Sequence, residues 1–241
     1  MTAELTEVER KTITYALRHP RGRYTADRAS QLSGVPKSTV YDWRRARVFE
    51  PDFTAAKPVM WSYRDLVLLR LLAWLRQGGM DRPVASEKVR SVKTHLSSGA
   101  EVRFIHATQT DVILNGGEVA GLEDDRANLL PSSDFYHLLA TFDLHEPIDE
   151  LRSSRRGRVW APDLVTPSSH SFISPWVLAG DPCIERTRIP TSAIHALRTD
   201  RALPIEAIVE LYPGLTVEAA DDAIDLERRL RGIDIPEPAA A

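Results

Sequence analysis

The sequence predicts a mainly α-helical protein with a small α/β middle region. Apolar residues recur at helical spacing in the first hundred residues and again in the last fifty, whereas residues 100–122 alternate or run apolar as in a β-hairpin. With 241 residues, 43% of them hydrophobic, the chain can form two or three small domains. We therefore expect three units, at residues 1–98, 99–166 and 167–241.

The first unit should contain two short helices joined by a tight turn. An amphipathic helix over residues 5–18 ends at the helix breakers Pro20 and Gly22. Thr25 can cap the next helix, Gly34 can form the turn that follows it, and Pro36 can begin a third helix.

A wing-like connection and two longer helices should complete this unit. The polar stretch after Pro51 is followed by an extended piece at residues 59–61. Ser62 and Asp65 form a capping pattern for a leucine-rich core helix that ends at Gly78-Gly79. Residues 83–96 suggest another helix, whose expected inner face is Val84, Val89 and Val92.

In the middle region the hairpin is expected to turn around Asn115-Gly116, and residues 135–144 to form a helix. The basic run at residues 151–158 is interpreted as an exposed linker, although it could also touch phosphate. The last unit should hold three helices, at residues 191–197, 204–211 and 216–230. Thr216 should cap the third of these helices, and its inner face should be Ala219, Ala223, Leu226 and Leu230.

Charge is distributed unevenly along the chain, although the net charge is only −3. Residues 10–47 carry ten basic side chains against two acidic ones, whereas residues 200–241 carry ten acidic side chains against four arginines. A basic segment can neutralise phosphates and an acidic one repels them. This separation indicates two different partners.

The basic segment coincides with the predicted helix, turn and helix, which favours DNA binding. In a helix-turn-helix the second helix enters the major groove, so its exposed face must offer hydrogen-bonding groups and cations. The alternative is a solvated basic helix pair that binds no nucleic acid. The candidate DNA-binding residues are Arg21, Arg23, Lys37, Ser38, Thr39, Tyr41, Arg44, Arg45 and Arg47, while Val40 and Trp43 should anchor the helix.

The stretch YTADRASQLSGVPKSTVYDWRRARVFEP, followed by WSYRDLVLLRLLAWLRQGG, resembles the winged helix of MerR-like regulators. A second resemblance lies in residues 174–224, which are similar to the DUF433 domain common in bacterial antitoxins and imply a helix-turn-helix-like C-terminal fold. Arg186 and Ala202 stand where that family pattern has glycine, which puts the turn geometry in question. The matching residues are Gly180, Pro182, Ile184, Thr187, Arg188, Ile189, Pro190, Ile208, Tyr212, Pro213, Leu215, Thr216 and Ala223.

Together the two resemblances look like VapB-type antitoxins. They imply a protein that binds its own operator as a transcriptional autoregulator and neutralises a PIN-domain ribonuclease toxin. A homodimer is the expected DNA-binding form, because such operators are commonly two-fold symmetric. The expected partner surface, for the toxin or a second subunit, is Arg188, Glu218, Asp221, Asp222 and Asp225, although a solvated acidic face is the alternative.

Enzymatic chemistry is not expected. His137 and His145 are isolated, and no HExxH motif or phosphate-binding glycine loop is present. The single Cys183 suits a reducing compartment, and no apolar run suggests a signal or membrane span, so we expect a cytoplasmic protein without cofactor or metal. Two alternatives remain at this point: a MerR-like transcription factor without a toxin, and a protein-interaction scaffold.

Overall fold

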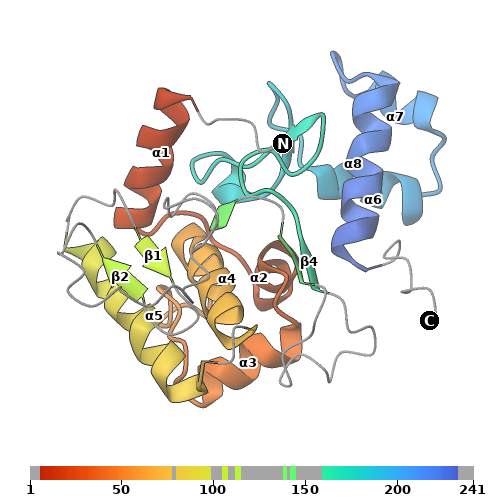
Figure 1. Cartoon of the computed structure of the whole chain (residues 1–241). Helices are drawn as coiled ribbons and strands as arrows, with labels where there is room; N and C mark the ends of the chain where they lie inside the picture. Colours follow the sequence, from red (N-terminus) through yellow and green to blue (C-terminus); the bar gives the residue numbers. More distant parts are fainter. Residues whose placement is uncertain are drawn as a thin grey trace, which may run out of the picture.

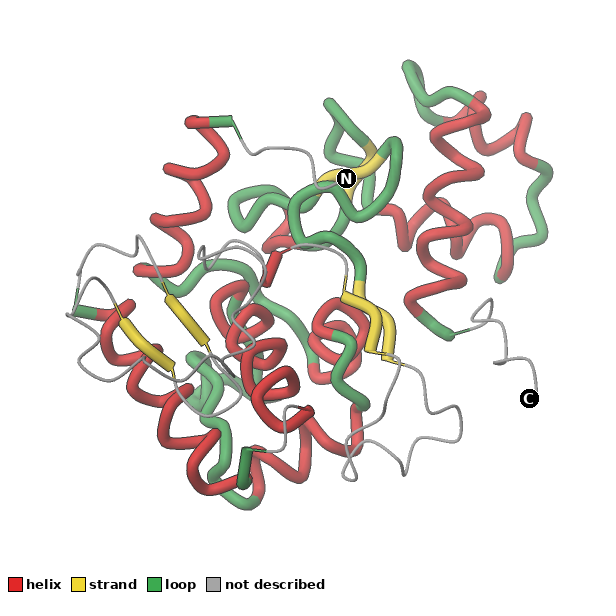
Figure 2. The backbone as a smooth tube through the Cα atoms, viewed as in Figure 1, coloured by secondary structure: helices red, strands yellow, loops and turns green. Residues whose placement is uncertain are grey.

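The computed structural model describes residues 6–77, 80–98, 105–107, 112–114, 138–139, 142–144 and 159–232. Within these residues the protein is mainly helical, with eight α-helices and three two-stranded antiparallel sheets (Figures 1 and 2). In this part of the chain no helix is long and apolar enough to cross a membrane. The predicted fold class is thus confirmed at the level of a mainly α protein with small β elements.

The N-terminal helices pack around one buried helix. They are α1 (Glu7–Arg18), α2 (Ala26–Ser33), α3 (Lys37–Arg45), α4 (Tyr63–Gln77) and α5 (Arg82–Ser97). Helix α4 contacts α1, α2 and α5, and its leucines are fully buried on every side. A helix that is apolar all round belongs inside a core. The leucine-rich segment is therefore the centre of this unit, as expected.

Local capping signals fix where several of these helices begin and end. The Thr25 hydroxyl accepts a hydrogen bond from the Arg28 amide, and Gly34 ends α2 with φ of 78°. The Ser62 and Asp65 side chains accept reciprocal bonds from each other's backbone N–H groups, at 3.0 and 2.9 Å. The predicted caps are confirmed, because each satisfies backbone donors that a helix end leaves open.

Helix α5 buries a slightly different face from the one predicted. Val89 and Val92 are buried, as expected, but Val84 is 43% exposed. The helix starts at Arg82, and its buried stripe runs through Ala85, Val89, Val92 and Leu96 at spacings of four, three and four. Val84 lies one residue, or about 100°, away from that stripe, so its predicted place on the inner face is wrong.

The segment between α3 and α4 forms a loop closed by isolated β-bridges, and we call this loop, at residues 51–61, the wing. Phe53 pairs with Met60, and Trp61 pairs with Tyr24 through backbone bonds of 2.9 Å in both directions. The extended piece predicted at residues 59–61 is found here. The pairing attaches the base of the wing to the strand-like segment just before α2.

In the middle region, strands β1 (Ile105–Ala107) and β2 (Val112–Leu114) pair antiparallel, with Ala107 opposite Val112. Asn115-Gly116 follows β2 and therefore does not join these two strands, and it lies outside the described residues. Strands β3 (Phe142–Leu144) and β4 (Val159–Ala161) also pair. The helix predicted over residues 135–144 is wrong at residues 142–144, because pairing with a distant strand overrides local spacing. The basic run at residues 151–158 lies outside the described residues.

A fully buried arginine ties the middle region to the helices. The Arg70 guanidinium on α4 donates to the carbonyls of Leu138, Leu139, Leu32 and Pro162. Burial lowers the pKa of Arg70 to about 10. These hydrogen bonds replace those that water would make to the guanidinium group, whose charge would otherwise be costly to bury.

The C-terminal unit follows the predicted order closely. It contains β5 (Ser171–Phe172), β6 (Cys183–Ile184), α6 (Thr191–Thr199), α7 (Ile205–Leu211) and α8 (Val217–Leu230). Thr216 caps α8 by accepting the Ala219 amide, and the four residues predicted for its inner face are buried. Leu226 and Leu230 belong to the same core as the N-terminal helices, whereas Ala219 and Ala223 belong to a smaller second core. Helix α8 therefore contributes buried residues to both cores.

Candidate nucleic-acid interface

Helix α3 has one buried face and one exposed polar face. Val40 and Trp43 are buried, as predicted, and anchor the helix against the core. Thr39 is only 4% exposed, so its predicted contact with bases is wrong. At spacings of three and four, Thr39, Val40 and Trp43 fall on the same inner side. The exposed face is formed by Lys37, Ser38, Tyr41, Arg44 and Arg45.

The cations on this face are accessible and weakly held. Lys37 pairs with Asp27 of α2 at 2.5 Å, and Arg45 pairs with Asp42 at 2.7 Å, all with side chains that are more than half exposed. Exposed ion pairs contribute little stability, so phosphate can replace these carboxylates at small cost. Among the described residues, no carboxylate forms an ion pair with Arg44.

The surface of α3 is also hollowed. Tyr41, Arg44 and Arg45 line a shallow concavity of about 440 Å³. Arg47 follows the helix with φ of 55°, and its carbonyl accepts a bond of 3.4 Å from Arg90 of α5. Two guanidinium groups beside a tyrosine ring in a hollow can bind an anion and hydrogen-bond to a base edge.

Two predicted DNA-binding residues lie apart from the α3 face. The Arg23 guanidinium lies 5.0 Å from the centre of the Phe53 ring, which places it beside the wing. Arg21 lies 6.0 Å from the ring centre of Tyr15 on α1. The structure therefore groups Arg23 with the wing and Arg21 with α1.

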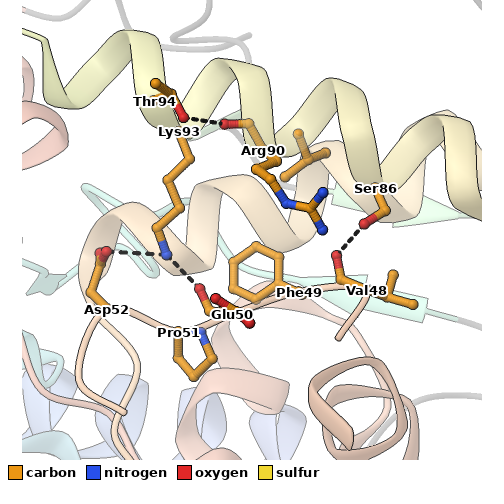
Figure 3. Close-up of a pocket in the computed structure, with 10 residues that line it drawn as sticks. Val48, Phe49, Glu50, Pro51, Asp52, Ser86, Arg90, Lys93 and Thr94 are labelled. Atoms are coloured by element: carbon orange, nitrogen blue, oxygen red, sulfur yellow. Dashed lines mark hydrogen bonds and ion pairs between the residues drawn. The ribbon is translucent and has the colours of Figure 1, made fainter. Parts of the chain in front are cut away.

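A buried charge cluster supports the junction between α3 and the wing (Figure 3). Lys93 of α5 donates to the Glu50 carbonyl at 2.6 Å and to Asp65 at 2.7 Å, and it lies 3.1 Å from Asp52. Asp52 in turn pairs with Arg64 at 2.6 Å. Burial raises the pKa of Asp65 to about 6, although Lys93 counteracts it. The cluster ties α4 and α5 to the wing.

The same junction forms a half-open pocket of about 260 Å³ between residues 48–52 and α5. Phe49 lies in its wall, 5.2 Å from the Lys93 ammonium, and the Ser86 hydroxyl donates to the Val48 carbonyl at 2.5 Å (Figure 3). Sequence reasoning found the cap of Ser62 and Asp65 but missed this cluster. In the sequence, the only local sign of this cluster was that several ionisable residues stand beside positions predicted to be apolar.

A second charged contact, the Arg28 seam, joins α2 to the C-terminal unit. The Arg28 guanidinium binds Asp181 at 2.7 Å and both carboxylate oxygens of Glu227 at 2.7 and 3.1 Å. The Thr191 hydroxyl donates to Glu227 at 2.6 Å. Burial opposes ionisation of Glu227, but Arg28, Thr191 and Arg231 outweigh it and keep its pKa below the ordinary value. Such a bidentate pair sets the orientation of the two groups as well as their distance.

Close backbone packing accompanies the Arg28 seam. The buried Tyr24 hydroxyl donates to the Gly180 carbonyl at 2.9 Å, and the Arg23 amide donates to the Ala179 carbonyl at 2.8 Å. A Cβ on Gly180 would lie 2.0 Å from the Tyr24 hydroxyl oxygen. Glycine is therefore required where this loop crosses the segment before α2.

The predicted protein-partner surface is largely exposed, and one of its residues also makes hydrogen bonds within the chain. Glu218, Asp221 and Asp225 are exposed on α8, and Arg188 is exposed in the loop before α6. Asp222 instead accepts bonds from the Ser168 hydroxyl at 2.6 Å and the His170 amide at 2.9 Å. Its carboxylate holds the turn before β5 but stays partly exposed, so its place in the partner surface remains a prediction.

The two positions where glycine was expected keep the glycine-like backbone. Arg186 has φ of 59° and Ala202 has φ of 53°, both in the left-handed region. Both positions therefore keep the positive φ of a glycine turn, although each residue carries a side chain.

Comparison with known families agrees with the C-terminal part of this picture. Residues 173–225 match the family described as "Protein of unknown function (DUF433)", so a DUF433 domain is found there. The matched region includes β6, α6, α7 and most of α8. No curated protein and no solved structure matches the chain.

Proposed function

We propose that the protein is a DNA-binding regulator in which α2 and α3 form a helix-turn-helix and α3 enters the major groove. The observation that carries this proposal is the α3 surface, where Lys37, Ser38, Tyr41, Arg44 and Arg45 lie on the polar face while Val40 and Trp43 are buried. Arg23 lies beside the wing rather than on the α3 face, and a cation at the wing is compatible with a MerR-like winged helix.

The order of side chains along α3 assigns their roles. Lys37, Ser38 and Tyr41 lie in the first turns, where the N-terminal part of a recognition helix meets base edges. Arg44 and Arg45 lie in the last turn, from which their guanidinium groups reach phosphates. The first set then gives specificity and the second gives salt-dependent affinity.

The experiment compares a double variant with a matched control. Arg44→Ala with Arg45→Ala should weaken binding to duplex DNA and reduce the slope of log K against log salt by about 1.8, since each lost phosphate contact contributes about 0.9. Arg186→Ala with Arg201→Ala removes two exposed cations from the DUF433 domain and should leave the slope unchanged. Equal slopes for both double variants would rule out α3 as the DNA-binding helix.

We further propose that the DUF433 domain makes the protein an antitoxin for a PIN-domain ribonuclease. Glu218, Asp221 and Asp225 are exposed at spacings of three and four, so they share one face of α8. Such a face repels DNA and is suited to the cationic groups of a ribonuclease. The alternative is a regulator without a toxin partner.

Co-expression with the product of an adjacent PIN-domain gene tests the antitoxin proposal. The purified complex should suppress ribonuclease activity, and Glu218→Lys with Asp221→Lys and Asp225→Lys should release it. Glu185→Lys with Asp200→Lys alters exposed carboxylates outside α8 and should leave the suppression intact. Failure of the wild-type protein to bind or inhibit that ribonuclease would favour the regulator without a toxin.

A further inference from the structure

Aromatic rings lie exposed where α1 meets the loop that follows β5. Tyr15 of α1 and Trp176 of the loop are 45% and 43% exposed, and their ring centres are 5.8 Å apart. The His19 ring, one turn further along α1, is centred 4.4 Å from the Tyr15 ring. Exposed rings that contact one another form a continuous surface, and such a surface marks an interaction site more often than scattered residues do.

Cations surround these rings. The Arg21 guanidinium lies 6.0 Å from the centre of the Tyr15 ring. Lys11, Tyr15 and His19 follow one another at spacings of four, so they share one face of α1. A shallow hollow of about 340 Å³ on α1 is lined by Tyr15 and His19 together with the cations Arg10, Lys11 and Arg18.

The hollow on α1 keeps a positive charge. Glu7 is the only carboxylate among the described residues that line it. It pairs with Lys11 at 2.6 Å, but both side chains are more than three quarters exposed, so this ion pair is weak. We call the whole surface the aromatic-basic patch, defined by Tyr15, His19, Trp176, Arg10, Lys11 and Arg21.

The combination of rings and cations matches the chemistry of a single-stranded nucleic acid. Unpaired bases stack on aromatic side chains, and cations between the rings bind the phosphates that link those bases. In a duplex each base is already stacked between its neighbours, so its flat faces are not available to protein rings. An acidic peptide would engage the cations but offers few flat groups for the rings.

We propose that the aromatic-basic patch binds a single-stranded nucleic acid. Bases stack on Trp176 and Tyr15, while Arg10, Lys11 and Arg21 bind the phosphates. Figure 1 shows α1 and α3 well apart, so this site is separate from the face proposed to enter duplex DNA. The inference therefore goes beyond the proposed function and does not depend on it.

Substitution of Trp176 tests the stacking. Labelled oligo-U and oligo-dT of about 12 nucleotides, within the site sizes of single-strand binders, should bind the full chain and quench its tryptophan fluorescence. Trp176→Leu should lower the affinity by about 5- to 150-fold, the loss expected for one stacked base, and should remove most of the quenching. Trp176→Phe should lose the quenching but keep most of the affinity, because phenylalanine keeps a flat ring. Tyr41→Leu, a matched change of an exposed ring on α3, should alter neither quantity.

Substitution of the cations tests the phosphate contacts. Arg10→Gln with Lys11→Gln should reduce the slope of log K against log salt by about 1.4, since each phosphate contact on a single strand contributes about 0.7. Arg44→Gln with Arg45→Gln on α3 is the matched control and should leave this slope unchanged. Circular dichroism should show that every variant is folded. Tighter binding of oligo-U would identify RNA as the occupant and tighter binding of oligo-dT would identify single-stranded DNA, and both results support the site.

Several outcomes would overturn the proposal. They are failure of both strands to bind, unchanged affinity in Trp176→Leu, and equal affinity for a strand of the same length whose sugars carry no bases. Equal losses in the patch and α3 variants would also overturn it, because binding would then follow overall charge. Tighter binding of poly-glutamate of equal charge than of either strand would identify the patch as a surface for an acidic protein instead.

Discussion

Four residues of the DUF433 domain other than glycine have positive φ: Leu178, Ala179, Arg186 and Ala202. Arg186 and Ala202 occupy the left-handed region, which costs a residue with a Cβ roughly 1–2 kcal/mol relative to glycine. Both residues lie in short connections, at residues 184–189 and between α6 and α7. The surrounding packing must therefore offset this cost in the native state.

Substitution with glycine should relieve this strain. Ala202→Gly is expected to raise the free energy of unfolding by about 1 kcal/mol, because glycine adopts positive φ without penalty. Urea denaturation measures the change. Ala207→Gly, inside α7, should lower stability by a similar amount because glycine is unfavourable in a helix. If both substitutions were destabilising, the turn at residue 202 would not be strained as described.

Glu227 should make stability depend on pH. Its folded pKa is held below the ordinary value of 4.5, so its contribution is fully present above about pH 4.5 and is lost as the pH falls through the folded pKa. Glu227→Gln should cost about 3 kcal/mol at neutral pH, because it leaves Arg28 partly unpaired in a buried site.

The difference between the wild-type and Glu227→Gln unfolding free energies isolates this effect. Asp65 has the opposite dependence, since its raised pKa of about 6 makes stability fall as the pH rises from about 3.8, and the subtraction removes its contribution. Chemical denaturation between about pH 3 and 7 should show the difference shrinking towards low pH. A difference that is constant over this range would contradict an ionised Glu227.

Among the structural elements, the Arg28 seam determines how the DUF433 domain sits on α2. It combines a bidentate ion pair, a tyrosine hydroxyl bond and a glycine crossing. Because α2 also packs against α3, any movement of the DUF433 domain would occur close to the proposed DNA-binding helix. The domain is thus packed directly against the helix pair proposed to bind DNA.

Two glycines with similar backbone angles test the tight packing at the seam. Gly180 has φ of +91° and meets Tyr24, whereas Gly214 has φ of +89°, and a Cβ added there would meet nothing within 4 Å. Gly214→Ala should cost only the backbone penalty of about 1 kcal/mol. Gly180→Ala should cost a further 1–3 kcal/mol or so from overpacking against Tyr24. Equal thermal unfolding losses would show that the loop is not held against Tyr24.

Short-range signals predicted the helices and their ends well. Thr25, Gly34, the pair of Ser62 and Asp65, and Thr216 each act within four residues, so their patterns are visible in the sequence. The exposed face of α3 followed from helical periodicity, apart from Thr39. The DUF433 match likewise rests on a contiguous stretch.

Long-range contacts were not predictable in the same way. Arg28 and Glu227 are 199 residues apart in sequence, and Tyr24 and Gly180 are 156 apart. Nothing near Arg28 distinguishes it from the exposed arginines of the basic segment, and although Arg70 stands between apolar residues, nothing in the sequence indicates its distant carbonyl partners. The β3–β4 pair was missed because its stability comes from a partner strand rather than from local propensity.

Across the whole molecule, opposite charges separate into different surfaces. The exposed cations of α3 and the exposed carboxylates of α8 belong to units that the Arg28 seam joins. This arrangement allows DNA and a protein partner to be bound by one chain without competing for the same residues. The proposed DNA-binding role depends on α3 being the helix that enters the major groove.

Fluorescence anisotropy of the wild-type protein, with a labelled duplex from directly upstream of its gene, measures DNA binding without any assumption about a toxin. If α3 enters the major groove of an operator in this duplex, the affinity should be high. Its logarithm should fall linearly with the logarithm of salt concentration. The binding should also survive competition by unrelated duplex. Affinity equal to that for random duplex, or binding that is insensitive to salt, would show that the protein is not an operator-binding regulator of this kind.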